Sequence, residues 1–247
     1  MTQVQTDPEL SQAQQDGAGT NSILASLPSA EYERLHHHLT RVSLEIKQEI
    51  WTPNQPIQAV YFPISFVASI LAQTDHGSVE VGTIGNEGVV GLPVYLGARS
   101  HTGTAMAQIP GEAYRMDAEV FRQESQRAPL REVLQRYTLG FMTQVSQGTA
   151  CNRTHSAEQR LARWLLVVHD RVGRAEFPLT QEFMGQMLGV RRATVSETAS
   201  ALQDAGLIRY RRGIMGIENR LGLEQVSCEC YGIVRGEFER LLGVAMG

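Results

Sequence analysis

The residues best suited to chemistry lie between positions 179 and 202, which read LTQEFMGQMLGVRRATVSETASAL. The pattern predicts a short helix from Gln181 to Leu188, capped by Thr180 and ended by Gly189, a residue that permits a left-handed turn. A second helix is predicted from about Arg192, because apolar residues recur after it at steps of four and three. Two short helices joined by a glycine-containing turn are typical of a helix-turn-helix motif, whose second helix enters the major groove of DNA.

Arginine side chains gather around this motif. Residues 206–217, GLIRYRRGIMGI, predict a β-hairpin with a basic tip, the wing of a winged helix-turn-helix. Arg192 is the predicted reader of bases, while Thr180 and Gln181 would contact phosphates at a helix N-terminus. The candidate DNA-binding residues are Thr180, Gln181, Arg191, Arg192, Thr194, Ser196, Glu197, Arg209, Arg211 and Arg212.

The charge distribution agrees with this interpretation although the net charge does not. The 247 residues carry a formal charge of −4, and the pI is near 6.0. Residues 153–220 nevertheless hold eleven arginines against seven acidic residues. A basic segment in an acidic chain indicates a part that meets a polyanion.

The sequence before the motif divides into segments with different apolar patterns. Residues 1–22 are polar and predicted to be a disordered tail, and a short helix is expected after Pro28. From about Ile50 to Met116, short apolar runs between Pro, Gly, Asn and Asp predict seven or eight short antiparallel strands. The fold class is therefore α+β.

A helix follows the strands, with one apolar stripe. Its members, spaced four, three, four and four, are Leu130, Leu134, Tyr137, Phe141 and Val145. The stripe would pack either against its own β domain or along a second copy of the chain, and the spacing leaves both open. We take it as the candidate dimerisation surface.

The cysteines and histidines give weaker signals. Three cysteines are too few and too scattered for a disulfide scaffold, which favours a reducing cytoplasm. Cys228 and Cys230 have no histidine near them in sequence, so two incidental thiols are favoured over a metal site. Cys151 and His155 could meet on one helix face, where a structural role at a domain joint is favoured over a redox or haem role. The consecutive histidines 36–38 point in different directions and indicate a solvated surface.

In the order of its elements and in the segment 179–213, the sequence resembles the family of the cyclic-AMP receptor protein and the FNR regulators. The resemblance implies a cyclic-nucleotide-binding-like β-roll, a long dimerisation helix and a winged helix-turn-helix. The domains expected are a tail at 1–22, a β-roll sensor at 23–128, a dimerisation helix at 129–152, a DNA-binding domain at 153–232 and a C-terminal tail at 233–247. FNR-type iron–sulfur sensing needs four cysteines, so it is not expected here.

The chain departs from the family pattern at the sensor. Nucleotide-binding members hold the ribose with a Gly-Glu pair and the phosphate with an Arg-Ser pair. Here Gly91-Leu92 and His101-Thr102 stand in those places, with Arg99-Ser100 displaced by two residues. Leu92 cannot accept hydrogen bonds from a ribose, so cyclic AMP is not expected to bind in the usual way. These six residues form the candidate ligand pocket, and its effector, if any, is unknown.

The second helix of the motif, which we call the reading helix because it would contact the bases, also departs from the family. The family's pattern there is often Arg-Glu-Thr-Val-Gly-Arg, whereas residues 192–197 read RATVSE. Ala193 cannot accept a hydrogen bond from cytosine, so an unusual operator is expected.

The prediction is thus a homodimeric, sequence-specific transcription regulator that binds double-stranded DNA and has no assigned cofactor or metal. RNA polymerase is a candidate further partner. The alternative is a small-molecule or redox sensor whose helix-turn-helix contacts a protein. No nucleophile–base set and no phosphate-binding glycine loop point to an enzyme. No apolar run reaches eighteen residues, and the first ten residues carry no cationic segment followed by an apolar block, so we expect a cytoplasmic protein and no membrane partner.

Overall fold

A computed structural model describes residues 21–75 and 77–243. Most of the predicted N-terminal tail lies outside these residues, but its last two residues are part of the fold. Asn21 is fully buried and its side chain caps helix α2 (Ser22–Ala25). The same side chain donates hydrogen bonds to the carbonyls of Pro63 and Gly88. The N-terminal domain therefore begins before residue 23.

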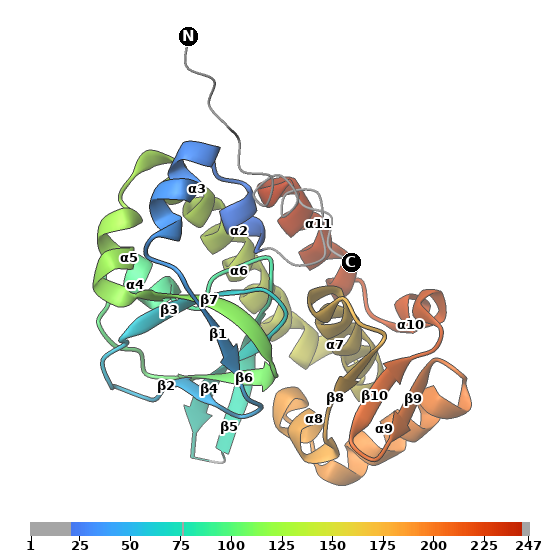
Figure 1. The fold of residues 1–247 in the computed structure, drawn as a ribbon. Coiled ribbons are helices and arrows are strands. Elements are labelled where there is room, and N and C mark those ends of the chain that lie inside the picture. Colours follow the sequence, from blue (N-terminus) through green and yellow to red (C-terminus); the bar gives the residue numbers. More distant parts are fainter. Residues whose placement is uncertain (1–20, 76, 244–247) are drawn as a thin grey trace.

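The N-terminal domain is a roll of two antiparallel sheets (Figure 1). One sheet has the order β1-β7-β3 and the other the order β2-β6-β4-β5. The strands are β1 (Thr40–Leu44), β2 (Glu49–Trp51), β3 (Ala59–Pro63), β4 (Val67–Thr74), β5 (Gly77–Ile84), β6 (Thr104–Ile109) and β7 (Gly111–Asp117). Short strands separated by Gly, Pro and Asp agree with the predicted β-roll, although the first strand precedes the expected span. The apolar faces of the sheets enclose a core that includes Phe62, Phe66, Ile84 and Met116.

Short helices pack on the roll, and one long helix connects it to the C-terminal domain. The short helices are α3 (Ser29–His36), α4 (Leu92–Tyr95) and α5 (Ala118–Glu124). Helix α6 (Ala128–Thr154) follows, with 27 residues, and runs from the roll to the C-terminal domain (Figure 1). Among the described residues, no helix is both long enough and apolar enough to cross a membrane.

The predicted stripe of α6 packs mainly within its own chain. Leu130, Leu134 and Tyr137 are fully buried in the core of the roll, and Phe141 packs against the same core. These side chains face inward because the roll presents an apolar surface to that side of the helix. The expectation that this stripe is the dimer surface is therefore wrong for its first three members, and the alternative of packing on the chain's own β domain holds for them.

The predicted C-terminal tail is a packed helix over most of its length. Helix α11 (Cys230–Leu242) returns to lie along α6 (Figure 1) and buries Val234, Phe238 and Leu241. These residues recur at helical spacing, the signal that the expectation of a tail overlooked. The Phe238 ring fits over Gly140, where even a methyl group would come within 2.9 Å of it.

The C-terminal domain is a helical cluster with a small sheet. Its elements are α7 (Ala157–Val172), β8 (Glu176–Pro178), α8 (Gln181–Leu188), α9 (Arg192–Asp204), β9 (Ile208–Arg211), β10 (Ile214–Ile217) and α10 (Arg220–Val226). The sheet order is β8-β10-β9. A second core around Trp164, Leu165, Phe183 and Leu202 holds these elements together.

Candidate functional site: DNA-binding surface and sensor pocket

Helices α8 and α9 form a helix-turn-helix with the predicted bounds. The Thr180 hydroxyl accepts a hydrogen bond from the Phe183 amide at 3.2 Å and caps α8. Gly189 ends α8 in the left-handed conformation, with φ of 61°. The Val190 amide then bonds back to the Gly185 carbonyl at 3.1 Å, which fixes the turn into α9.

The two sides of α9 differ in the way a reading helix requires. Val195, Ala199 and Leu202 are buried against the domain. Arg191, Arg192, Ala193 and Glu197 are exposed on the opposite side, with Thr194 and Ser196 partly exposed beside them. The N-terminal half of α9 is thus open to a ligand as large as a DNA groove.

Strands β9 and β10 form the predicted wing. Arg212 and Gly213 connect them with φ of 52° and 79°, the positive values of a two-residue turn that suits a β-hairpin. The turn places the exposed side chains of Arg211 and Arg212 at the end of the hairpin.

A groove of about 460 Å³ joins the helix-turn-helix to the wing. Four of the predicted DNA-binding residues lie around it although they belong to three separate elements. Its lining residues are Thr180, Gln181, Glu182, Arg192, Tyr210, Arg212 and Gly213. Within the described residues, no carboxylate forms an ion pair with Arg192, Arg211 or Arg212. These cations are available to an external anion.

Arg209 is placed differently from the other wing arginines. Its guanidinium forms an ion pair with Glu176 on β8 and, at 2.8 Å, with Glu218 after β10. These two carboxylates neutralise the charge and hold the side chain along the small sheet. The geometry thus assigns Arg209 a structural contact within the domain.

An apolar pocket of about 500 Å³ lies between the roll and α6. It is lined by Trp51, Ile70, Ile84, Gly91, Leu92, Pro93, Leu96, Ala98, His101, Thr138, Phe141, Met142, Val145 and Ser146. None of these residues is Arg, Lys, Asp or Glu. The pocket can enclose an apolar molecule, but its lining has no charged group for a phosphate.

Three of the six predicted pocket residues line this cavity. Gly91, Leu92 and His101 are among its walls, whereas Arg99, Ser100 and Thr102 are not. The latter three are exposed. His101 is held by accepting a hydrogen bond from the Gly103 amide on Nδ1 at 2.9 Å, and its ring meets Trp51 edge-on.

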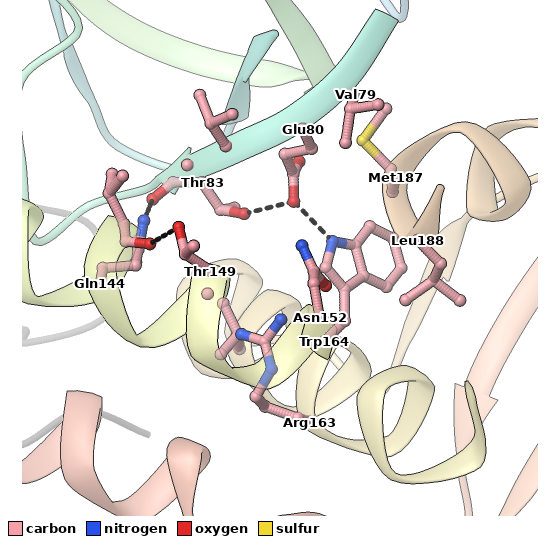
Figure 2. Close-up of a pocket in the computed structure, with 15 residues that line it drawn as sticks. Val79, Glu80, Thr83, Gln144, Thr149, Asn152, Arg163, Trp164, Met187 and Leu188 are labelled. Atoms are coloured by element: carbon pink, nitrogen blue, oxygen red, sulfur yellow. Dashed lines mark hydrogen bonds between the residues drawn. The ribbon is translucent and has the colours of Figure 1, made fainter. Parts of the chain in front are cut away.

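The C-terminal domain is docked on the sheet of the roll that contains β5, as Figure 2 shows. Glu80 on β5 lies at the centre of this junction, and its carboxylate accepts a hydrogen bond from Trp164 Nε1 at 2.9 Å. Ser69 and Thr83 donate to the same carboxylate at 2.6 and 2.9 Å. Burial raises the pKa of Glu80, and these hydrogen bonds partly oppose the shift. The sequence analysis missed this contact, because its partners are 84 residues apart.

The structure also brings together the two cysteine features of the sequence. Cys151 and His155, at the end of α6, lie beside Cys228 and Cys230, at the start of α11. Sequence analysis found no histidine for Cys228 and Cys230 because the nearest one in space is more than seventy residues away in the chain. The histidines at 36–38 are exposed, as expected.

Comparisons with known proteins agree with this architecture. Residues 159–226 match the family model described as a Crp-like helix-turn-helix domain. No curated protein sequence matches the chain.

Several solved structures have a similar fold, and the match extends over nearly the whole length of each known chain. FixK2 from Bradyrhizobium japonicum is 19% identical, with a TM-score of 0.65 over 77% of this chain and 98% of its own. A putative CRP/FNR-family regulator from Eubacterium rectale is 19% identical, with a TM-score of 0.62 over 81% and 94%. A CRP-family regulator from Thermus thermophilus is 16% identical, with a TM-score of 0.62 over 83% and 98%. At these identities the similarity establishes the fold.

The β-roll, the long helix and the helix-turn-helix define a two-domain α+β architecture in which one long helix connects the roll to the C-terminal domain. Residues 159–226 thus match a Crp-like helix-turn-helix domain, and the chain as a whole has a fold similar to that of the CRP/FNR-type regulators named above.

Proposed function

We propose that this chain is a CRP/FNR-type transcription regulator that binds a near-palindromic DNA site as a homodimer, with α9 in the major groove, and that an apolar small molecule controls it. The observation that carries the DNA-binding role is the groove that gathers Thr180, Gln181, Arg192 and Arg212 around one opening. Two hydroxyl or amide groups and two free guanidiniums at one opening suit contacts to phosphates and base edges.

The roles of these residues follow from their positions. Arg192 starts the exposed side of α9, where a guanidinium can bond to guanine O6 and N7. Thr194, Ser196 and Glu197 lie next to it and would adjust the base preference. Thr180 and Gln181, at the N-terminus of α8, and Arg211 and Arg212, on the wing, would contact the phosphate backbone. Arg191 immediately precedes α9 and would contact a phosphate there.

The exposed side of α6 is the surface we propose for dimerisation. Leu139 and Met142 expose 48% and 59% of their area, and because they are three residues apart in a helix they form one small apolar patch. Together with Ser146, Thr149 and Arg153 they follow steps of three and four, the spacing of a two-helix seam. A second copy of α6 is the natural occupant, because a symmetric pair would place two reading helices about 34 Å apart on DNA. Val145, from the predicted stripe, lies at the margin of this seam.

The sensor pocket supports an effector other than a cyclic nucleotide. Leu92 occupies the wall where a ribose would need an acceptor, and the lining has no guanidinium for a phosphate. Met142 and Ser146 belong both to this pocket and to the proposed seam. An apolar effector in the pocket would therefore bias how the two α6 helices pair.

The alternative is a sensor whose helix-turn-helix contacts a protein, and the salt dependence of the binding affinity distinguishes it from a DNA-binding regulator. Binding to DNA releases counterions, so its affinity falls steeply with salt concentration, whereas a protein contact gives a shallower dependence. RNA polymerase, the candidate further partner, would act at the promoter once the regulator is bound to DNA.

Selection of bound duplexes from a random DNA pool tests the proposal. The purified protein should enrich one sequence with two-fold symmetry and half-sites about one helical turn apart. Adding an apolar extract of cells should change the affinity for that sequence if the pocket takes an apolar effector. Enrichment of no sequence, with or without the extract, would contradict DNA reading by this chain.

A further inference from the structure

Three thiols and one imidazole converge at the junction of α6 and α11. Cys151 and His155 lie at the C-terminal end of α6, Cys228 lies just before α11, and Cys230 is its first residue. The four ligand atoms all lie within 4.8 Å of one another. The three cysteines form a small buried cluster, and the His155 side chain is mostly buried beside them.

Two distances within the cluster are close to the edges of a metal-centred tetrahedron. Zinc binds thiolate sulfur at about 2.3 Å and imidazole nitrogen at about 2.0–2.1 Å, so tetrahedral geometry puts two sulfurs about 3.8 Å apart and sulfur and nitrogen about 3.6 Å apart. The Cys151 and Cys228 sulfurs are 3.5 Å apart, and the Cys230 sulfur is 3.6 Å from His155 Nδ1. An iron–sulfur cluster binds its ligands through different iron atoms, and four ligand atoms this close leave no room for one.

The groups around the cluster orient its members as outer-shell partners of a metal do. His155 Nε2 lies 3.2 Å from the Glu229 carboxylate, and Nδ1, on the other side of the ring, lies 3.6 Å from the Cys230 sulfur and 3.3 Å from the Thr154 hydroxyl. A carboxylate on the distal nitrogen of a metal-binding histidine fixes its tautomer and ring orientation. Gln147 Nε2 donates a hydrogen bond to the Cys230 sulfur at 3.2 Å, which suits a thiolate.

The cluster lies where the DNA-binding domain both begins and ends. Cys151 and His155 precede α7, while Cys228 and Cys230 follow α10, so the pairs flank the helix-turn-helix match at 159–226. A single ion held by both pairs would fasten the two ends of that domain to each other. It would also fasten α11 to α6.

We propose that Cys151, His155, Cys228 and Cys230 bind one zinc ion per chain in a closed, structural site. Binding releases the three thiol protons to solvent, and the imidazole binds in its neutral form through Nδ1. Three thiolates and Zn²⁺ leave one net negative charge. All four positions of the tetrahedron are filled by the protein, so the ion has no open position for a reacting molecule.

The first test is the metal content of the full-length protein, purified without chelators and analysed by atomic emission. We expect about one zinc per chain. Protein stripped of metal under reducing conditions and then titrated with Co²⁺ should develop the visible d–d absorption of tetrahedral cobalt and a thiolate-to-cobalt charge-transfer band at one equivalent. Added zinc should displace the cobalt and remove both bands.

Variants show which residues hold the ion. Cys228→Ser and His155→Ala should lose the stoichiometric zinc, and Glu229→Gln should weaken metal affinity about 10–100-fold, because the ligand histidine loses its orienting carboxylate. His37→Ala, which alters an exposed histidine far from the cluster in sequence, should retain one zinc. Circular dichroism of each variant separates loss of metal from loss of fold.

Results on the unaltered protein alone can overturn the site. A metal-free native protein that binds no Co²⁺ when all three thiols are reduced would contradict it. A Cys151–Cys228 disulfide in the protein as isolated from cells, found by mass spectrometry, would replace it with a thiol redox pair. None of these measurements depends on DNA binding, so the site and the proposed function can fail independently.

Discussion

Arg171 and Glu87 form an ion pair inside the molecule, with 2.8 Å between Arg171 Nε and the Glu87 carboxylate. Their side chains are 2% and 1% exposed, and they join α7 of the DNA-binding domain to the loop after β5 of the roll. Gln144 on α6 accepts a second hydrogen bond from the Arg171 guanidinium at 2.8 Å and donates to the Thr83 carbonyl at 2.9 Å. One guanidinium thus connects the roll, the long helix and the C-terminal domain.

Removing one member of this pair should destabilise the protein by about 3–5 kcal/mol, because the remaining charge is buried without its partner. Urea unfolding of Arg171→Met and of Glu87→Gln, followed by circular dichroism, measures the loss. Arg41→Ala breaks the exposed pair with Glu112 and should cost less than about 1 kcal/mol. If Arg171→Met and Glu87→Gln lost no more unfolding free energy than Arg41→Ala, the pair would not hold the domains together.

Arg192→Ala should weaken binding to the selected operator by about 1–3 kcal/mol and relax the preference at one base pair of each half-site. The reason is loss of a two-point hydrogen bond to a base edge, which no neighbouring side chain can replace. Fluorescence anisotropy with single-base variants of the operator measures both effects. Arg240→Ala, at an exposed position of α11, is the control and should change neither. An Arg192→Ala protein that still distinguishes every base would disprove the assigned role.

Arg212→Ala should weaken binding to all DNA sequences alike and reduce the slope of affinity against salt by about one. Arg209→Ala should leave that slope unchanged, because Glu176 and Glu218 already neutralise its guanidinium. Titrations at several salt concentrations on specific and random duplexes give the slopes. Equal reductions in both variants would mean that Arg209 leaves its carboxylates to contact DNA.

Met142→Glu should convert the dimer into a monomer, since it places two carboxylates in the proposed seam, where they repel each other and lose water. Sedimentation equilibrium at micromolar concentration measures the change, and affinity for a full operator should fall with it. Leu221→Glu alters an exposed leucine on α10 and should remain dimeric. If the Met142→Glu protein dimerised as tightly as the unaltered protein, the dimer interface would not include this part of α6.

His169 should make the protein less stable in mild acid. Its pKa is lowered from 6.5 by burial and by the Arg220 cation, with Asp170 opposing the shift, and Arg220 donates a hydrogen bond to its Nδ1 at 2.8 Å. The unfolded chain therefore binds the proton more readily, and the free energy of unfolding falls as pH drops through 6.5 toward the lowered value.

His169→Gln should flatten this pH dependence, because glutamine does not titrate. Urea unfolding at pH 7.5, 6.5 and 5.5 measures the effect, and His37→Gln, at an exposed site, should behave like the unaltered protein. A His169→Gln protein with an undiminished loss of stability in acid would assign that loss to other groups.

The sequence by itself determined the helix-turn-helix, since its signals are local. A capping threonine, a glycine able to adopt positive φ and apolar residues at helical spacing specify α8, the turn and α9 within 25 residues of chain. The same holds for the wing, whose Arg212-Gly213 turn follows from neighbouring residues. The short apolar runs also predicted short antiparallel strands, because turn residues separate them, whereas the β-roll was implied by the resemblance to the family.

Tertiary structure alone decided which surfaces meet. An apolar stripe on α6 can be satisfied equally by the chain's own roll or by a second copy, and only packing shows that Leu130, Leu134 and Tyr137 take the first. Arg171 and Glu87 are 84 residues apart, and Cys151 and Cys228 are 77 apart. A sequence gives each of these side chains a chemistry but no partner, because the partner depends on how α6, α7 and α11 fold back on the roll.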